Sequence, residues 1–246
     1  MSTTLTYTRY ELLRTFRNKR FMIFSLIFPV IMFFLIAAPR GHDLVEGTHI
    51  PYANYFMAGM AAWGAMAAVL AGGARIAMER AAGWQRQMRI TPLPVRTYFA
   101  TKVLSGYAMA LITMAALAVV GSLFGAHLTL GGWLGLGGMV LVGLVPFAVM
   151  GILMGHLLTL DSMGPAMGGI TSLFAVLGGS FGQIATSGAL HTLSEALPSY
   201  WLVQAGSSVA SGSGGWPLRA WIVIGVWTLV LARATVWVYG RDTERV

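Results

Sequence analysis

A stretch of 58 residues without a single Asp, Glu, Lys or Arg, from Val103 to Leu160, sets the strongest limit on what this chain can fold into. As one straight helix it would be about 87 Å long, far longer than a membrane is thick. It must therefore fold back, and the Gly-rich segment 127–132 is the natural turn. Because a crossing needs about 20 apolar residues, this division predicts two membrane-spanning helices, near 103–126 and 133–158.

The rest of the chain is also poor in charge. Of all residues, 57% are hydrophobic and 10% are charged, whereas a soluble domain carries about 25% charged residues. The first apolar segment begins only at Phe21 and lacks a small-residue cleavage site, so it is a span rather than a signal peptide. The sequence predicts an all-α integral membrane protein with six transmembrane helices, the other four lying near 21–39, 52–74, 165–186 and 216–239.

The basic residues predict the topology. With six crossings, thirteen of them lie on one side, before the first span, between spans two and three, and after the last. The positive-inside rule places that side in the cytoplasm, together with both termini and the tail 241–246. Fourteen Arg against two Lys, with abundant Ala and Gly, indicate a bacterial genome of high G+C content. We therefore expect the membrane to be a bacterial cell membrane.

Residues 1–20 form either an interfacial helix or a plain basic tail. Leu5, Leu12, Leu13 and Phe16 share one face at helical spacing, which favours a helix lying on the inner membrane surface. Arg9 interrupts that face. Both interpretations place the segment in the cytoplasm.

Two further segments are too polar for ordinary spans. Residues 187–215 are rich in Ser, Gly and Thr, which predicts short re-entrant or interfacial helices before the last span. The loop 40–51 carries His42 and His49 with two acids between them; a cation site is one interpretation, but the spacing favours a solvated loop. His156 lies near Asp161, where a helix-end role is favoured over proton coupling.

Several kinds of chemistry are excluded by missing motifs. The chain has no G-x-x-x-x-G-K-[ST] phosphate loop, no H-E-x-x-H and no cysteine. It therefore lacks the means to cradle a nucleotide or to hydrolyse a peptide by these routes, or to use a thiol. We predict a chain that is not an enzyme and holds no metal or cofactor of its own.

The most informative segment is cytoplasmic and runs from Met78 to Pro94. It mixes charged residues with Trp84 and Ile90 and stops at prolines, which is typical of a short amphipathic helix. A helix joined rigidly to two spans is a suitable lever for a partner protein. The alternative is an ordinary inner-surface loop.

At this segment the chain resembles the ABC-2 type permeases, the membrane subunits of one class of ABC exporters. The resemblance rests on Glu79-Arg80, on Gly83, and on Thr91-Pro92-Leu93. It continues with Pro165, which would open span five, and with Leu197-Pro198-Ser199-Tyr200-Trp201 before the last span. The segment around Phe181 lacks the proline that the family often has there.

The resemblance implies an assembly and a division of roles. The chain would pair with a second, identical or different, permease and with two ATP-binding subunits, which bind ATP and Mg. Spans two and five would line the pathway, and the helices within 187–213 would close it outside. The residues implied for the helix that couples to the ATPase are Glu79, Arg80, Gly83, Trp84, Arg86, Gln87, Arg89, Thr91, Pro92 and Leu93. Candidates for the pathway are Ser172, Ser180, Phe181, Gln183 and Thr186, and those for the outer gate are Leu197, Pro198, Tyr200 and Trp201.

The implied function is ATP-driven export of a hydrophobic or amphipathic compound, such as a drug, an antibiotic or a lipid-like molecule. The few polar groups of span five suit such a cargo better than an ion. Export of a polysaccharide or glycolipid is the alternative within the class. A secondary transporter would need a buried acid or an inverted repeat, and only Asp161 comes near the first requirement.

Overall fold

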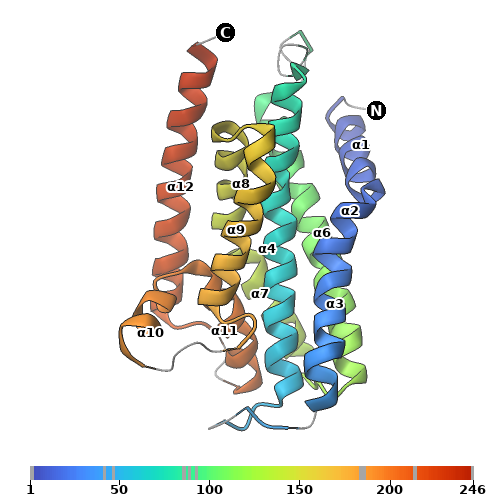
Figure 1. Ribbon diagram of the computed structural model, residues 1–246, viewed down its shortest axis with the longest axis vertical. Coiled ribbons are helices and arrows are strands. Elements are labelled where there is room, and N and C mark those ends of the chain that lie inside the picture. Colours follow the sequence, from blue (N-terminus) through green and yellow to red (C-terminus); the bar gives the residue numbers. More distant parts are fainter. Residues whose placement is uncertain are drawn as a thin grey trace.

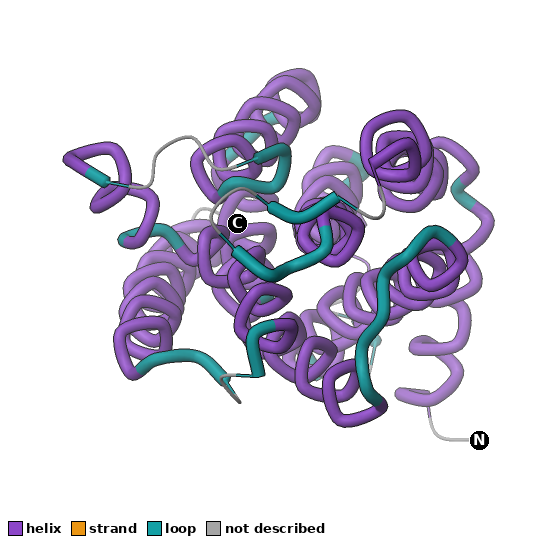
Figure 2. The backbone as a smooth tube through the Cα atoms, turned by 90° about the horizontal axis from the view of Figure 1, so that it is seen from below, coloured by secondary structure: helices purple, strands orange, loops and turns teal. Residues whose placement is uncertain are grey.

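The computed structural model describes residues 3–40, 43–45, 48–84, 87, 90–91, 94–182, 187–212 and 215–244. In this part of the chain nearly every residue is helical, and the only β contact is an isolated bridge between Leu44 and Pro51. Figure 2, which views the molecule along its long axis, shows helices joined by loops. The predicted all-α fold is confirmed.

Five helical stretches in the described residues are long and apolar enough to cross a membrane. They are α4 (Tyr52–Ala81), α6 (Val95–Leu123), α7 and α8 together (Leu130–Gly143 and Val145–Leu157), α9 (Leu160–Gly178) and α12 (Leu218–Glu244, apolar to Gly240). The predicted first span is a sixth, shorter apolar helix, Ser25–Arg40. The chain is therefore a multi-pass membrane protein.

The first apolar segment is helical but irregular. After α1 (Thr3–Arg17) the chain continues through α2 (Lys19–Met22), a π-helical turn η1 (Ile23–Ile27), α3 (Phe28–Met32), a second π-helical turn η2 (Phe33–Ala37) and the 3-10 turn η3 (Ala38–Arg40). Pro29 has no N–H, so it cannot donate to the carbonyl of Ser25, four residues earlier. The hydroxyl of Thr113 on α6 donates to that carbonyl instead, at 3.1 Å.

Helix α4 is the centre of the bundle. In the most apolar 18-residue stretch of α4, 83% of the residues are buried inside the protein. The corresponding shares are 33% for α6 and 11% for α12. Small residues let neighbouring backbones approach it closely. A Cβ atom added to Gly73 would lie 2.0 Å from the carbonyl oxygen of Gly151 on α8, and one added to Gly59 would lie 2.5 Å from that of Ser180.

The boundaries of three helices differ most from the sequence-based expectation. Helix α6 begins at Val95, directly after Pro94, rather than at residue 103. Helix α4 continues seven residues past the predicted end at residue 74, so Glu79 and Arg80 belong to it. Helix α9 occupies 160–178 rather than 165–186. It begins earlier because Thr159 and Ser162 form a capping box, and it ends earlier because Gly179 adopts a left-handed conformation (φ 82°) that terminates a helix.

The short helices expected before the last span are present as α10 (Gly188–Glu195) and α11 (Pro198–Ala210). Figure 1 shows α10 at the end of the bundle opposite both termini. We call these the α10 end and the N/C end. Both termini share one end, as an even number of crossings requires.

Candidate functional site

A cluster of buried charges joins three helices at the N/C end of the bundle. Its first centre is the carboxylate of Glu79, which is 5% exposed near the end of α4. Three described side chains donate to it: Lys102 from α6 at 2.6 Å, Tyr98 from α6 at 2.6 Å, and Arg14 from α1 at 2.7 Å. The helices α1, α4 and α6, distant from one another in sequence, thus meet at the two oxygens of one side chain.

The second centre of the cluster is Glu11, which α1 carries inward. Its Oε1 atom lies 2.8 Å from Nζ of Lys102 and 3.4 Å from Nε of Arg75. Arg75 also donates to the hydroxyl of Thr15 at 3.0 Å. Lys102, which is 1% exposed, therefore bridges two carboxylates from two different helices.

The cluster explains how α1 is oriented. Glu11 and Thr15 face the bundle and are buried, whereas Leu5 and Leu13 are 55% and 45% exposed. The polar side of this helix points into the protein, and part of its apolar side points outward, as is stable where the outside is lipid rather than water. Burial and the nearby carboxylates of Glu11 and Glu79 raise the pKa of Tyr7, so this α1 phenol stays protonated.

Arg80, the neighbour of Glu79, ties α4 to a different helix. Its guanidinium donates to the carbonyl oxygens of Gly155 and His156, the last turn of α8. A cation at a helix C-terminus is favourable because the unpaired carbonyls carry partial negative charge. The rings of His156, Phe99 and Tyr239 pack against one another with centroids 5.6 Å apart, which adds α6 and α12 to this corner.

The predicted coupling segment divides into a buried part and an exposed part. The side chains of Glu79 and Arg80 are engaged inside the bundle, as described above. Beyond them Gly83 adopts a left-handed conformation (φ 69°) that ends the helix, and Trp84, Gln87 and Thr91 are exposed. The predicted residues Arg86, Arg89, Pro92 and Leu93 lie outside the described residues. A docking surface for a partner on this segment would therefore begin after Arg80.

Sequence reasoning did not single out Glu11 or Lys102 as site residues. A usable signal was present: Glu11 is the sole acid of a basic N-terminal segment, and Lys102 is one of two lysines in the chain. Arg75 and Glu79 are also four residues apart, which is one helical turn once the helix is known to continue past residue 74. Only the fold shows that the two carboxylates share Lys102.

The predicted pathway residues are spread along the end of α9. Ser172 is exposed, Ser180 is buried against Gly59, and Phe181 is 40% exposed. Gln183 and Thr186 lie outside the described residues. Ser172 continues a row of exposed small residues on α9 that includes Gly164 and Gly168, and a Cβ atom added at either glycine would meet nothing within 4 Å.

The predicted outer-gate residues lie at the junction of α10 and α11. Pro198 is buried at the start of α11, and Leu197 is half-buried before it. The indole of Trp201 donates to the carbonyl of Glu195 at 2.9 Å, which locks the turn. The hydroxyl of Tyr200 accepts from Gln204 at 2.9 Å.

The same junction is fixed to the last span. The carboxylate of Glu195 pairs with Arg219 on α12 at 2.5 Å, and the indole of Trp227 donates to the carbonyl of Ala196 at 2.9 Å. His191 lies 3.5 Å from the other oxygen of Glu195. No cluster of three His, Cys, Asp or Glu that could hold a metal occurs in the described residues. Two residues of the loop 40–51, His42 and Glu46, lie outside the described residues.

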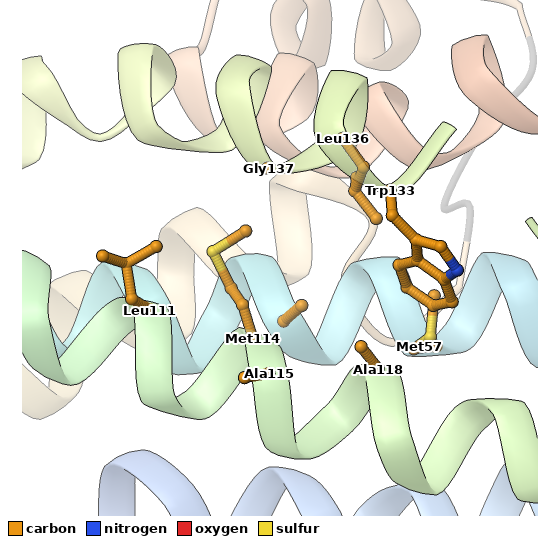
Figure 3. Close-up of a pocket in the computed structure, with 9 residues that line it drawn as sticks. Met57, Leu111, Met114, Ala115, Ala118, Trp133, Leu136 and Gly137 are labelled. Carbon is orange, nitrogen blue, oxygen red and sulfur yellow. The ribbon is translucent and has the colours of Figure 1, made fainter. Parts of the chain in front are cut away.

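An apolar cavity of about 250 Å³ opens between α4, α6 and α7 in the half of the bundle near the α10 end. Figure 3 shows Met114 and Trp133 projecting into it from α6 and α7. Leu111 and Ala115 line it and are themselves exposed, so the cavity communicates with the outer surface of the bundle. Its other lining residues are Met57, Ala61, Ala118, Leu136 and Gly137.

Taken together, the apolar helices and the buried charge cluster at the N/C end define a multi-pass membrane protein. The sequence model of the ABC-2 family transporter proteins matches residues 40–238. The chain belongs to this family. It is also 24% identical over 215 residues to the Bacillus subtilis (strain 168) protein YvfS, which carries the name of a putative transport permease; the match covers 85% of this chain and 82% of that one.

Proposed function

We propose that the chain is the permease subunit of an ATP-driven exporter and that it moves a hydrophobic or amphipathic compound, such as a drug, an antibiotic or a lipid-like molecule. Membership of the ABC-2 family implies an ABC ATP-binding partner. The sequence has no phosphate-binding loop, so ATP and Mg would be bound by that partner.

The observation that carries the cargo class is the apolar cavity between α4, α6 and α7. It is open toward the outside of the bundle and lined by Met57, Met114 and other apolar side chains. Thioether side chains adapt to ligands of different shapes. A polysaccharide would need many hydrogen-bonding groups, and of the lining side chains only Trp133 offers a donor.

Two features support an assembly with a second permease. First, only 22% of the residues in the most apolar stretch of helix α9 are buried inside the protein. Second, the exposed side of this helix carries Gly164, Gly168 and Ser172. In lipid, small residues favour helix association because they let backbones approach. We place this face against a second permease copy, and each permease would engage one ATP-binding subunit.

The orientation in the proposal follows from charge. Both termini and the segment after α4 lie at the N/C end (Figure 1), where most basic residues of the sequence gather. The positive-inside rule makes this the cytoplasmic side of a bacterial inner membrane. The exposed residues from Gly83 onward would then face the ATPase.

A matched pair of glycine substitutions tests the cargo assignment. Gly137 lines the cavity, whereas its neighbour Gly138 is exposed away from it, and neither would place a Cβ atom closer than 4.0 Å to another group. In vesicles that contain the permease and its ATPase, Gly137→Leu should lower ATP-dependent uptake of an amphipathic dye several-fold, because leucine fills the cavity. Gly138→Leu should leave uptake unchanged. Equal uptake in both variants and the wild type would remove the cavity from the proposal.

A further inference from the structure

A basic residue lies on the exposed apolar side of α12, where the surrounding side chains offer it no partner. Arg233 is exposed, and so are its helical neighbours Leu229, Val230, Val236 and Trp237, which are 60–72% exposed. No hydrogen bond, ion pair or ring contact to Arg233 occurs among the described residues. Figure 1 shows α12 at one edge of the bundle.

Helix geometry places Arg233 at membrane depth. Arg219, paired with Glu195 at the end of α10, marks the end of α12 near the α10 end. Arg233 is 14 residues further along, which is about 21 Å of helix. The hydrocarbon core is about 30 Å thick, so the Cα atom of Arg233 lies about 9 Å short of the opposite boundary. An arginine side chain can extend along the helix from there to the headgroup level.

The chain itself has few acids that could meet this guanidinium. Three of them are already held in ion pairs, namely Glu11, Glu79 and Glu195. Asp43 and Glu46 belong to the sequence segment that precedes α4, and Asp161, at the start of α9, forms no ion pair with Arg233 in the described part of the chain. Asp242 and Glu244 are 9 and 11 residues further along α12, which is about 14 and 17 Å of helix and too far for a direct ion pair. A membrane offers a different partner at the right depth, since the phosphates of phospholipids lie at the headgroup level and pair with arginine through two parallel hydrogen bonds.

We propose that Arg233, with Trp237 one turn nearer the N/C end, forms a binding site for the phosphate of an anionic phospholipid in the adjacent leaflet. Val230 and Val236 provide an apolar surface for its acyl chains. The site would fix the depth and tilt of α12, whose opposite side packs on α8. The proposal depends only on insertion of α12 in lipid and is independent of the cargo and of the ATPase.

The absence of cysteine makes a direct measurement feasible. The full chain with the single substitution Val236→Cys is labelled with a fluorophore and placed in phosphatidylcholine vesicles. A small fraction of acyl-chain nitroxide lipid is added, either phosphatidylglycerol or phosphatidylcholine. Quenching by the phosphatidylglycerol form should indicate about fivefold enrichment over phosphatidylcholine, as expected for one basic residue near anionic lipid. Raised salt should reduce the preference.

Two further variants decide the result. In the Val236→Cys background, Arg233→Gln should abolish the preference and Arg233→Lys should retain most of it. A label at Val119 on α6, which is 63% exposed with no charged residue on the same helix face, should show none. Equal quenching by both lipids in the parent protein, or a preference that survives Arg233→Gln, would overturn the proposal. So would spontaneous disulfide-linked dimers of the unlabelled Val236→Cys variant, because a second copy would then cover this face.

Discussion

The ammonium nitrogen of Lys102 lies 2.6 Å from Oε1 of Glu79, and both side chains are almost completely buried. The same nitrogen lies 2.8 Å from Glu11 on α1. One cation therefore joins the start of α6 both to the end of α4 and to the N-terminal helix. A movement of α1 relative to the spans would have to break a buried ion pair, so α1 and the ends of α4 and α6 should move as one unit.

Removing Lys102 should destabilise the protein strongly. Lys102→Met leaves Glu11 and Glu79 buried with fewer compensating cations, and breaking a buried pair in this way costs about 3–5 kcal/mol. Thermal unfolding in detergent should show the loss as a lower midpoint. Lys19→Met is the matched control, because Lys19 is the only other lysine and is exposed. Equal midpoints for the two variants would contradict a stabilising role for the cluster.

A double-mutant cycle should show that Lys102 and Glu79 act on each other. Glu79→Gln alone leaves Lys102 with one carboxylate, and combined with Lys102→Met it removes both ends of the pair. Residues in direct contact show coupling of about 0.5–3 kcal/mol. The double variant should therefore be less destabilised than the sum of the two single variants. Strict additivity would indicate that the contact contributes nothing.

A glycine should be needed at position 83 because of its left-handed backbone conformation, and not because a larger side chain would collide with neighbouring atoms. Its φ is 69°, and an added Cβ atom would meet nothing within 4 Å. Gly83→Ala should cost about 1–2 kcal/mol from left-handed strain, and Gly83→Asn should cost less because asparagine tolerates this region. Gly138→Ala, at an equally open helical position, should not destabilise. If coupling to the ATPase depends on the exit direction of the chain after α4, ATP hydrolysis by the assembled exporter should fall slightly with Asn and further with Ala.

Much of the fold was accessible from the sequence because lipid imposes a simple rule on composition. The charge-free stretch 103–160 must fold back at 127–132, and the structure turns there between α6 and α7. The polar, Ser- and Gly-rich segment before α12 does form short helices. These features depend on length and hydropathy alone, which local sequence reports directly.

The buried cluster was less accessible because its members come from segments far apart in the chain. Glu79 was singled out from a motif, which placed it on a cytoplasmic helix facing a partner, whereas the structure places it inside, on the end of α4. Two facts were needed to see this: that α4 extends past residue 74, and that α1 turns Glu11 inward. Neither follows from hydropathy, since charged residues near a span end are equally consistent with water and with a buried partner.

The orientation can be tested by labelling single cysteines in a chain that has none of its own. Thr48 is exposed in the loop at the α10 end, and Gln87 is exposed after α4 at the N/C end. A membrane-impermeant maleimide added to intact cells should label Thr48→Cys but reach Gln87→Cys only after permeabilisation, because the N/C end carries most of the positive charge. The reverse pattern would place the termini outside and would invert the proposed transport direction.

The exposed small residues of α9 should mediate contact with a second permease. In a Cys-free background, Ser172→Cys should form a disulfide between copies on mild oxidation, because Gly164 and Gly168 on the same side allow the two helices to approach closely. Adding Gly168→Leu should suppress that crosslink while the monomer's unfolding midpoint stays unchanged, since leucine there meets no other part of the same chain. Val119→Cys, equally exposed to lipid on α6, should crosslink weakly in both backgrounds. Strong crosslinking at Val119 and none at Ser172 would move the subunit contact away from α9 and, with it, the proposed position of the pathway.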